Sequence, residues 1–425
     1  MRQPRQDSLA FLYQLQFFGV KLGLDNIRTL LDSVGRPQDD LRIVHIAGTN
    51  GKGSTAAALA NIFHAAGLSA GLYTSPHLQG FTERIRIDLR PIDVAELGGL
   101  IEELRPLAER LRATFFELST ALALLSFQRQ GVKWAILETG MGGRLDATNL
   151  VEPELCLLTP IAFDHAVHLG NDLAAIAAEK AGILKPGVPL ISAPQPRSAE
   201  QVIARRAAAV AAPLLQLERD FCWSNSAAGG ILTGGGYRIA GIQPGLKGEH
   251  QQQNLALAGA AAAWLGSNGE ALSAAAIKQG LEQVRWPGRL EWLPERILLD
   301  GAHNQAGAET LAAYLQAEKL TPVHLVVGCK ADKDYAALLT PLLPCCGRIY
   351  AVPAPVEAAV AVEDLVRLAL QAGLPARAYG RPAQALAAAR QERGPEEVLV
   401  VAGSLFLVAA VREQLVESGS LAICA

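Results

Sequence analysis

The stretch that decides the fold is Ile43-Val44-His45-Ile46-Ala47-Gly48-Thr49-Asn50-Gly51-Lys52-Gly53-Ser54-Thr55. An apolar strand runs into a glycine-rich turn, and an alanine-rich helix follows. The glycines let backbone amides close around phosphate oxygens, while the lysine adds positive charge and the hydroxyls can ligate Mg²⁺. The strict phosphate-loop pattern is not met, because Ile46 replaces its first glycine and Gly53 separates Lys52 from Ser54. The stretch still predicts a nucleotide-phosphate site, since an ordinary strand-turn-helix corner would not need the lysine and the hydroxyl.

The composition sets broad limits on the class of protein. A chain of 425 residues, half of them hydrophobic, is long enough for two or three domains with cores of their own. A net charge of −3 gives no basic face, so nucleic acid is not expected as a partner. The six cysteines include no C-x-x-C pair, and no apolar run is long enough to span a bilayer. We therefore expect reduced thiols and a cytoplasmic protein without a membrane segment.

The first half of the chain alternates between strand-like and helix-like segments. This alternation predicts a parallel sheet with helices on both faces, in which ligands bind beyond the carboxyl ends of the strands. Glu138 follows an apolar strand and is therefore expected in the same crevice as the phosphate loop. The expected helices are within 7–34 and at 55–66, 93–112 and 116–130, and the expected strands are 70–73, 81–87, 134–137 and 155–161.

The second half shows a change of pattern and then a new alternation. Residues 220–245 carry glycines and short alternating runs that suggest a small antiparallel sheet. The segment 282–296, with two prolines, three arginines and two tryptophans, shows no clear period and is interpreted as a linker. Alternation restarts beyond it, with strands expected near 296–300, 323–328, 348–352 and 397–402 and helices near 305–318, 362–372, 382–392 and 404–416. We expect domains at 1–284 and 296–425 with the linker at 285–295.

The side chains of Glu138, His165 and Lys180 could take part in catalysis or metal binding, but each could instead have a purely structural role. A carboxylate such as Glu138 at the end of a buried strand suits Mg²⁺, although a salt-bridged or capping Glu would look the same. His165 also follows a strand, beside Asp164, but a lone histidine is often structural and Mg²⁺ usually prefers oxygen. Lys180 by residue type alone is a solvated lysine on a helix.

A series of motifs along the chain resembles one family. They are Gly-Thr-Asn-Gly-Lys-Gly-Ser at 48–54, Thr-Ser-Pro-His-Leu at 74–78, Glu-Arg-Ile-Arg-Ile at 83–87, Glu-Thr-Gly-Met-Gly-Gly-Arg-Leu-Asp-Ala-Thr-Asn at 138–149, Asp-His at 164–165, Glu-Lys-Ala-Gly-Ile at 179–183, Pro-Gly-Arg-Leu-Glu at 287–291 and Asp-Gly-Ala-His-Asn at 300–304. Together, in this order and spacing, they resemble the folylpolyglutamate synthase/dihydrofolate synthase branch of the Mur ligase superfamily. The resemblance covers nearly the whole chain.

The resemblance implies an α/β fold, with an N-terminal P-loop ATPase domain built on a parallel sheet and a smaller, Rossmann-like C-terminal α/β domain. It implies catalytic roles for Lys52, Glu138, His165 and Lys180. The residues implied to bind two magnesium ions are Ser54, Ser75, Glu138, His165 and Lys180, the last of these carried as a carbamate. Those implied to bind ATP are Thr49, Asn50, Gly51, Lys52, Gly53, Ser54, Thr55, Asn254, Arg289, Asp300 and His303. Those implied to bind the pteroate or folate are Val20, Lys21, Leu22, Phe115, Phe116, Glu117, Leu118, Leu145, Asp146 and Ala147.

The activity implied by the resemblance is an ATP-dependent ligation. L-Glutamate would be joined to dihydropteroate, to the glutamate tail of reduced folates, or to both, through an acyl phosphate and with release of ADP and phosphate. The expected partners are these small molecules and no macromolecule, and the resemblance favours a monomer.

Two other functions fit parts of the sequence. A Mur-type cell-wall ligase shares the phosphate loop but needs a UDP-sugar-binding N-terminal domain, and only about 42 residues precede Ile43. A nucleotide switch of the P-loop class would hydrolyse nucleotide slowly and without any amino acid, and it has no need of the second α/β domain. Glutamate-stimulated release of ADP would separate the ligase from the switch.

Overall fold

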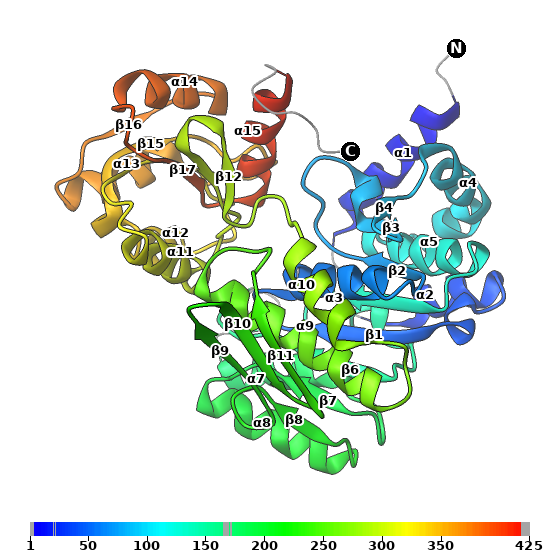
Figure 1. Cartoon of the computed structure of the whole chain (residues 1–425). Coiled ribbons are helices and arrows are strands. Elements are labelled where there is room, and N and C mark those ends of the chain that lie inside the picture. The colour runs from blue at the N-terminus through cyan, green and yellow to red at the C-terminus, as the bar shows by residue number, and fades with distance from the viewer. Residues whose placement is uncertain (1–3, 20, 22, 165–169, 171, 418–425) are drawn as a thin grey trace. The chain divides into compact units, whose positions relative to one another are not determined.

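The structure is a computed structural model that describes residues 4–19, 21, 23–164, 170 and 172–417. The chain forms two compact units (Figure 1). The first consists of residues 1–161, 171–245 and 251–285, and the second of 162–170, 246–250 and 286–425. Among the described residues, no helix is both long and apolar enough to cross a membrane.

An eight-stranded sheet forms the framework of the N-terminal unit, in the order β4-β3-β2-β5-β1-β6-β7-β8. Neighbouring strands are parallel along β2-β5-β1-β6-β7-β8. At the β2 edge, β3 and β4 continue the sheet with antiparallel pairing. The central strands carry the phosphate loop and Glu138 at their carboxyl ends, as the sequence predicts. The strands are β1 (Arg42–Ala47), β2 (Ala70–Tyr73), β3 (Ile85–Ile87), β4 (Arg90–Pro91), β5 (Trp134–Glu138), β6 (Leu155–Leu158), β7 (Leu190–Ser192) and β8 (Leu214–Gln216).

Helices pack on both faces of this sheet, and the alternation of side chains along β5 separates the two layers. The Trp134 ring packs edge-on against Phe63 of α3 (Lys52–Ala65), with centroids 5.2 Å apart. Its neighbour Ala135 points to the opposite face, into the core built with α1 (Pro4–Gln14), α2 (Asp25–Ser33), α4 (Val94–Leu111) and α5 (Phe115–Arg129). This core holds α5 in place, and the N-terminal end of α5 carries four of the residues predicted to bind the acceptor, Phe115 to Leu118.

The rest of the N-terminal unit contains elements that the sequence shows less clearly. The antiparallel sheet predicted at 220–245 is confirmed as β9 (Phe221–Ser226), β10 (Gly229–Gly234) and β11 (Tyr237–Ile242). The helices are α7 (Leu173–Lys180), α8 (Arg197–Ala209), α9 (Glu249–Ser267) and α10 (Ala274–Gln283), with α10 packed on α3.

Two predicted strands are shorter than expected. In place of one strand at 81–87, Phe81–Arg84 form a 3₁₀ helix and only Ile85–Ile87 are extended. The reason is local, because the Glu83 carboxylate accepts hydrogen bonds from the backbone amides of the preceding turn, at 2.9 to 3.0 Å. The strand expected at 155–161 ends at Leu158, and the Pro160 carbonyl accepts hydrogen bonds from the phosphate-loop backbone instead.

The C-terminal unit contains a six-stranded sheet in the order β12-β13-β17-β14-β15-β16. All neighbours are parallel except the edge pair β12–β13. The strands are β12 (Glu291–Leu293), β13 (Ile297–Leu299), β14 (Val323–Val327), β15 (Cys346–Ala351), β16 (Ala376–Ala378) and β17 (Leu399–Ala402). The helices are α11 (Gln305–Ala317), α12 (Tyr335–Leu339), α13 (Val362–Gln371), α14 (Pro382–Glu392) and α15 (Leu405–Glu417). Strand β12 lies in a segment where the sequence shows no period, because three residues at a sheet edge are too few to establish one.

Candidate active site

The phosphate loop turns tightly between β1 and α3, and two of its glycines are required there. Gly48 and Gly51 have φ angles of 143° and 90°, which side-chain-bearing residues rarely adopt. A Cβ atom on Gly48 would also collide with the Thr159 hydroxyl, and one on Gly51 with the Asn254 amide. The turn is thus packed against Asn254 of α9, which is one of the residues predicted to bind ATP.

The Lys52 ammonium lies over the opening of this turn. It donates hydrogen bonds to the carbonyls of Gly48 (3.2 Å) and Thr49 (3.1 Å), and it lies 4.0 Å from Glu138 Oε1. Its side chain is only 15% exposed, so its charge is weakly screened by water. An ammonium in this position suits the triphosphate of a nucleotide.

Glu138 ends β5 and is buried, with 4% of its surface exposed. Its Oε2 accepts a hydrogen bond from the Ser75 backbone amide at 3.0 Å. Ser54, in the first turn of α3, is also buried. One carboxylate and two hydroxyls are oxygen donors of the kind that Mg²⁺ prefers, so these residues fit the predicted ion. Within the described ranges no three His, Cys, Asp or Glu side chains cluster as a metal site, and predicted ligand His165 lies outside those ranges.

Lys180 lies at the phosphate loop, although more than a hundred residues separate them in the sequence. It is the last residue of α7, it is 4% exposed, and its Nζ donates to the Gly48 carbonyl at 2.8 Å. The glycine-rich loop after β5 supports this end of α7, since a Cβ on Gly143 would lie 2.7 Å from the Glu179 carbonyl and 2.8 Å from that of Lys180. Because Lys180 is buried, it is not the solvated helix lysine that its residue type alone suggests.

The residues predicted to bind the acceptor fall into different environments. Phe116 packs over Gly140, where a Cβ would lie 2.5 Å from its ring. Asp146 is buried, and it accepts hydrogen bonds from the amides of Met141 (2.9 Å) and Thr148 (3.0 Å) and from the Thr148 hydroxyl (2.6 Å). Burial raises the pKa of Asp146, and these hydrogen bonds oppose that rise. Asp146 therefore fixes the shape of the loop that carries Leu145 and Ala147.

Other residues predicted to bind the acceptor make contacts that stabilise the fold. Glu117 accepts a hydrogen bond from the Thr114 amide at 2.7 Å and forms the capping box of α5. Leu118 is fully buried in the core, and the Lys21 ammonium donates to the Arg112 carbonyl at 2.6 Å. Val20 and Leu22 lie outside the described residues.

In the C-terminal unit, the predicted nucleotide residues gather after β13. Both Asp300 carboxylate oxygens accept backbone hydrogen bonds at 2.9 Å, from Leu290 and Ala302, and this fixes the turn between Arg289 and His303. The Arg289 guanidinium packs against Gly301, where a Cβ would lie 2.8 Å from it. His303 Nε2 lies 3.4 Å from the Asp164 carboxylate. The structure therefore brings Arg289, Asp300 and His303 together within one unit.

Sequence reasoning missed two groups of side chains near these residues. In the C-terminal unit, Lys333 forms a close ion pair with Asp164, which also accepts a hydrogen bond from Asn304 at 3.1 Å. The signal for Lys333 was its place in an Asp-Lys-Asp run just after a predicted strand. In the N-terminal unit, Arg84 lies over the rings of Phe81 and Phe115, an environment that its Glu-Arg-Ile-Arg-Ile motif does not indicate.

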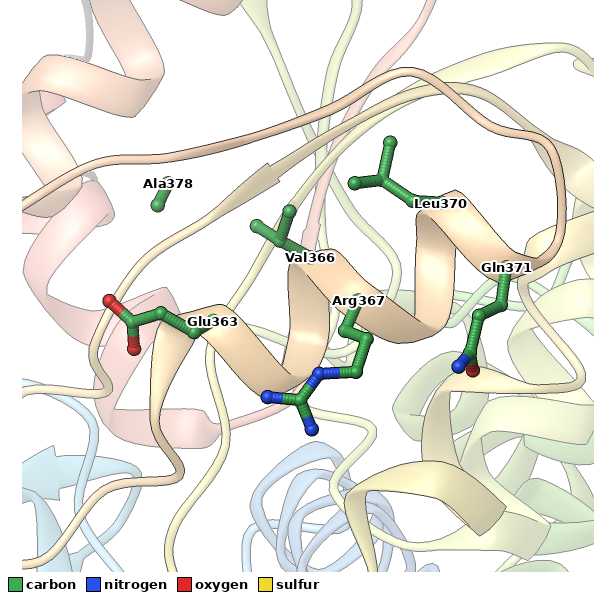
Figure 2. A pocket seen from close by; sticks show the side chains of 6 residues that line it. All are labelled: Glu363, Val366, Arg367, Leu370, Gln371 and Ala378. Atoms are coloured by element: carbon green, nitrogen blue, oxygen red, sulfur yellow. The ribbon is translucent and has the colours of Figure 1, made fainter.

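One surface hollow lies apart from all of these residues. Figure 2 shows it along α13 of the C-terminal unit, with Ala378 of β16 on its far side. Its lining is Glu363, Val366, Arg367, Leu370, Gln371 and Ala378. None of the predicted site residues that the structure describes lines it.

Comparisons with known proteins address both units. Residues 46–262 match the Mur ligase middle domain, and residues 291–414 match the C-terminal domain of dihydrofolate synthetase. The folylpolyglutamate synthase of Lacticaseibacillus casei is 37% identical over 92% of this chain and 93% of its own. The dihydrofolate synthase/folylpolyglutamate synthase of Bacillus subtilis is 34% identical over 96% of this chain and 99% of its own.

The chain belongs to the folylpolyglutamate synthase/dihydrofolate synthase family.

Solved structures of the family have the same fold. Escherichia coli FolC in complex with DHPP and ADP superimposes with a TM-score of 0.90 at 30% identity, over 98% of this chain and 99% of that one. Mycobacterium tuberculosis folylpolyglutamate synthase, complexed with ADP and AMPPCP, gives a TM-score of 0.88 at 30% identity, over 96% and 98%. The α/β fold expected from the sequence is confirmed, as is membership of the Mur ligase superfamily.

Proposed function

We propose that this protein is an ATP-dependent ligase that joins L-glutamate to dihydropteroate, to the glutamate tail of reduced folates, or to both. The observation that carries the proposal is the convergence of Lys52, Glu138 and Lys180 on the Gly48 turn, in a chain of this family. Phosphate-binding turns of this kind are shared by many nucleotide enzymes, so the family membership supplies the substrate class.

The residues of the phosphate loop would hold and orient the nucleotide. Backbone amides of residues 51–53, at the start of α3, would bind phosphate oxygens, because those of Thr49 and Asn50 donate to the Pro160 carbonyl. Lys52 would offset the charge on the transferring phosphoryl group. Ser54, Ser75, Glu138, His165 and Lys180 would hold two magnesium ions, with Lys180 as its carbamate. Bound magnesium supplies electrostatic stabilisation of charge on the phosphoryl oxygens. Asn254 would bind ATP from the N-terminal unit, and Arg289, Asp300 and His303 from the C-terminal unit.

The reaction needs activation because a carboxylate is a poor electrophile. A carboxylate oxygen of the acceptor attacks the γ-phosphorus of ATP, the bond to the β-phosphate oxygen breaks, and ADP leaves. The glutamate amine then attacks the carbonyl carbon of the acyl phosphate, loses a proton, and displaces inorganic phosphate as the amide forms. Water must be excluded in between, since it would hydrolyse the acyl phosphate.

The segments predicted to bind the acceptor support two alternative substrates. Val20 to Leu22, Phe115 to Leu118 and Leu145 to Ala147 match the pteroate pocket of bifunctional bacterial enzymes. We therefore expect the purified protein to add glutamate both to dihydropteroate and to a reduced folate. If dihydropteroate is not converted, the assignment is reduced to the polyglutamate activity.

An assay of ADP release over a panel of pteroates, folates and amino acids tests the proposal. Release should require both glutamate and a pteroate or folate, and the Lys52→Ala variant should lose most of it while keeping its circular dichroism spectrum. Equal rates with and without glutamate would favour a nucleotide switch. Formation of AMP in place of ADP would exclude the acyl-phosphate route. The linker bounds at 285–295, the monomeric state and the cytoplasmic location stay predictions.

A further inference from the structure

Four aromatic side chains of the N-terminal unit surround one arginine. Tyr13 stacks on Phe115 with ring centroids 6.0 Å apart, and Phe115 meets Phe81 edge-on at 5.7 Å. His77 packs edge-on against both Tyr13 (6.2 Å) and Phe81 (6.3 Å). The Arg84 guanidinium carbon lies 5.0 Å from the Phe115 ring centre and 5.9 Å from that of Phe81. We call these four rings the aromatic cluster.

Arg84 is buried, and among the residues that the structure describes no carboxylate forms an ion pair with it. The residue is 7% exposed, and its Nε donates to His77 Nδ1 at 2.8 Å. In the part of the chain that the structure describes, neither terminal nitrogen has a hydrogen-bond or ion-pair partner, and neither is sealed from solvent. The two terminal nitrogens of a buried cation thus keep donors that water or a ligand could use.

Two carboxylates act on this charge from a distance, Glu138 and Glu83, but among the described residues neither forms an ion pair with Arg84. His77 Nδ1 accepts the hydrogen bond from Arg84 Nε, so this ring nitrogen carries no proton. The Glu83 carboxylate is occupied by the backbone amides of Leu78, Gln79 and Gly80. A buried guanidinium is costly unless an anion or several acceptors bind it, so this site favours a ligand with negative charge.

The cluster adjoins the catalytic residues of the same unit. Phe115 is next to Phe116, which packs on Tyr73 at 5.9 Å, and Tyr73 is the last residue of β2, two positions before Ser75. Arg84 also lies near enough to Glu138 for the two charges to interact. A ligand bound at the cluster would therefore have its acidic group on the side of the phosphate loop.

We propose that the terminal nitrogens of Arg84 bind the carboxylate of the acceptor that is to be phosphorylated, while its aromatic ring packs against Tyr13 and Phe115. The inference rests on the proposed function and adds a specificity residue to it. A planar guanidinium presents two parallel N–H donors to a carboxylate, which orients the acid as well as binding it. A neutral ester of the same molecule would keep the ring contacts and lose these hydrogen bonds.

The test compares binding of pteroic acid and its methyl ester to wild-type protein and to Arg84→Met, Arg84→Lys and Arg105→Met. Methionine approximates the length of the arginine stem without charge, and lysine keeps the charge without the planar fork. Arg105 is the matched control, because its guanidinium also covers a ring, that of Phe11 at 4.6 Å, but bonds to Glu109 on the surface of α4. Circular dichroism and ATP affinity report whether each variant is folded.

Wild-type protein and Arg105→Met should bind the acid at least ten-fold more tightly than the ester, since a hydrogen bond to a charged group is worth roughly ten- to hundred-fold in affinity. Arg84→Met should bind the acid and the ester equally. It should also have a higher KM for the acceptor and an unchanged KM for ATP. Arg84→Lys should recover part of the preference for the acid over the ester. Equal binding of acid and ester by wild-type protein would overturn the inference, and so would a full preference in folded Arg84→Met. Failure of the proposed function is distinguishable, because it would appear as absence of glutamate-dependent ADP release by wild-type protein.

Discussion

Lys180 is an ordinary helix lysine in the sequence, and its chemistry depends on where its amine lies. The structure buries it at the phosphate loop, within 2.8 Å of the Gly48 carbonyl. An ammonium there would be repelled by two bound magnesium ions, with little water to screen it. Reaction of the neutral amine with carbon dioxide gives an anion with two oxygen donors, which suits magnesium.

We predict that Lys180 carries a carbamate when magnesium is bound. Protein equilibrated with ¹³C-bicarbonate and Mg²⁺ should show a carbamate carbon resonance that Lys180→Ala lacks. The alanine variant should lose activity, and a short carboxylic acid should restore part of it by occupying the vacated space. A spectrum identical to that of Lys180→Ala would rule the modification out.

His45 is a second residue whose properties come from burial. It has no exposed surface, its Nε2 contacts the Thr148 hydroxyl at 2.8 Å, and its Nδ1 has no partner among the described residues. Since the Thr148 hydroxyl donates to Asp146, its oxygen accepts from His45. Burial lowers the pKa of His45 to about 3, with a further contribution from the charge of Lys185.

This lowered pKa predicts a pH-dependent stability. The unfolded chain gains a proton on His45 below about pH 6.5, whereas the folded protein does not until about pH 3. The free energy of unfolding should therefore fall with decreasing pH by up to about 1.4 kcal/mol per unit from this residue. Urea denaturation of wild-type and His45→Asn proteins between pH 7 and 4 measures it. The stability advantage of the wild type should shrink as the pH falls, and parallel curves would contradict the argument.

At the scale of elements, α5 shows how a helix start places functional side chains. Thr114 and Glu117 each bond the other's backbone amide, at 3.2 and 2.7 Å, and so fix the first turn that carries Phe115 and Phe116. Glu117 also accepts from the Asn26 amide at 3.3 Å, which connects α5 to α2. The predicted role of Glu117 at the acceptor is thus accompanied by a clear structural role.

Substitution of Glu117 separates these two roles. Glu117→Ala should lower the free energy of unfolding by about 1 kcal/mol, because a buried amide loses its acceptor. Glu117→Gln keeps an acceptor oxygen and should keep both the stability and the KM for the acceptor. Thermal unfolding and steady-state kinetics measure the two effects. A large rise in KM for Glu117→Gln, with stability unchanged, would show that the carboxylate itself binds substrate.

At the scale of the whole molecule, the residues predicted to bind ATP are divided between two units. Asn254 and the phosphate loop belong to one, and Arg289, Asp300 and His303 belong to the other. A nucleotide bound by both sets would hold the units together, and closure would also exclude water from the acyl phosphate.

We therefore predict that ATP and folate together make the molecule more compact. Small-angle scattering should give a smaller radius of gyration with both ligands than with neither. The change should be reduced in His303→Ala, which keeps the phosphate loop intact. An unchanged scattering profile with both ligands demonstrably bound would count against closure.

Much of this protein follows from local sequence. The glycines and lysine of the phosphate loop, the apolar strands before Glu138 and Asp300, and the helices expected at 93–112 and 116–130 depend on neighbouring residues. Their local patterns therefore predict them closely. The limits of short elements such as β12 and β3 depend on pairing partners and turn contacts elsewhere, and the sequence does not show these.

Only the tertiary structure decided which side chains meet. Lys180 reaches Gly48 because α7 ends beside the glycine-rich loop, and Asn254 reaches Gly51 because α9 packs on the turn. Arg84 forms no ion pair with its neighbour Glu83, because the Glu83 carboxylate accepts hydrogen bonds from the backbone instead. Burial and charge pairing are properties of the space around a residue, and the packing of distant segments sets them. The sequence therefore determined the fold class, the family and the phosphate loop, and the folded chain decided the environment in which each of these side chains works.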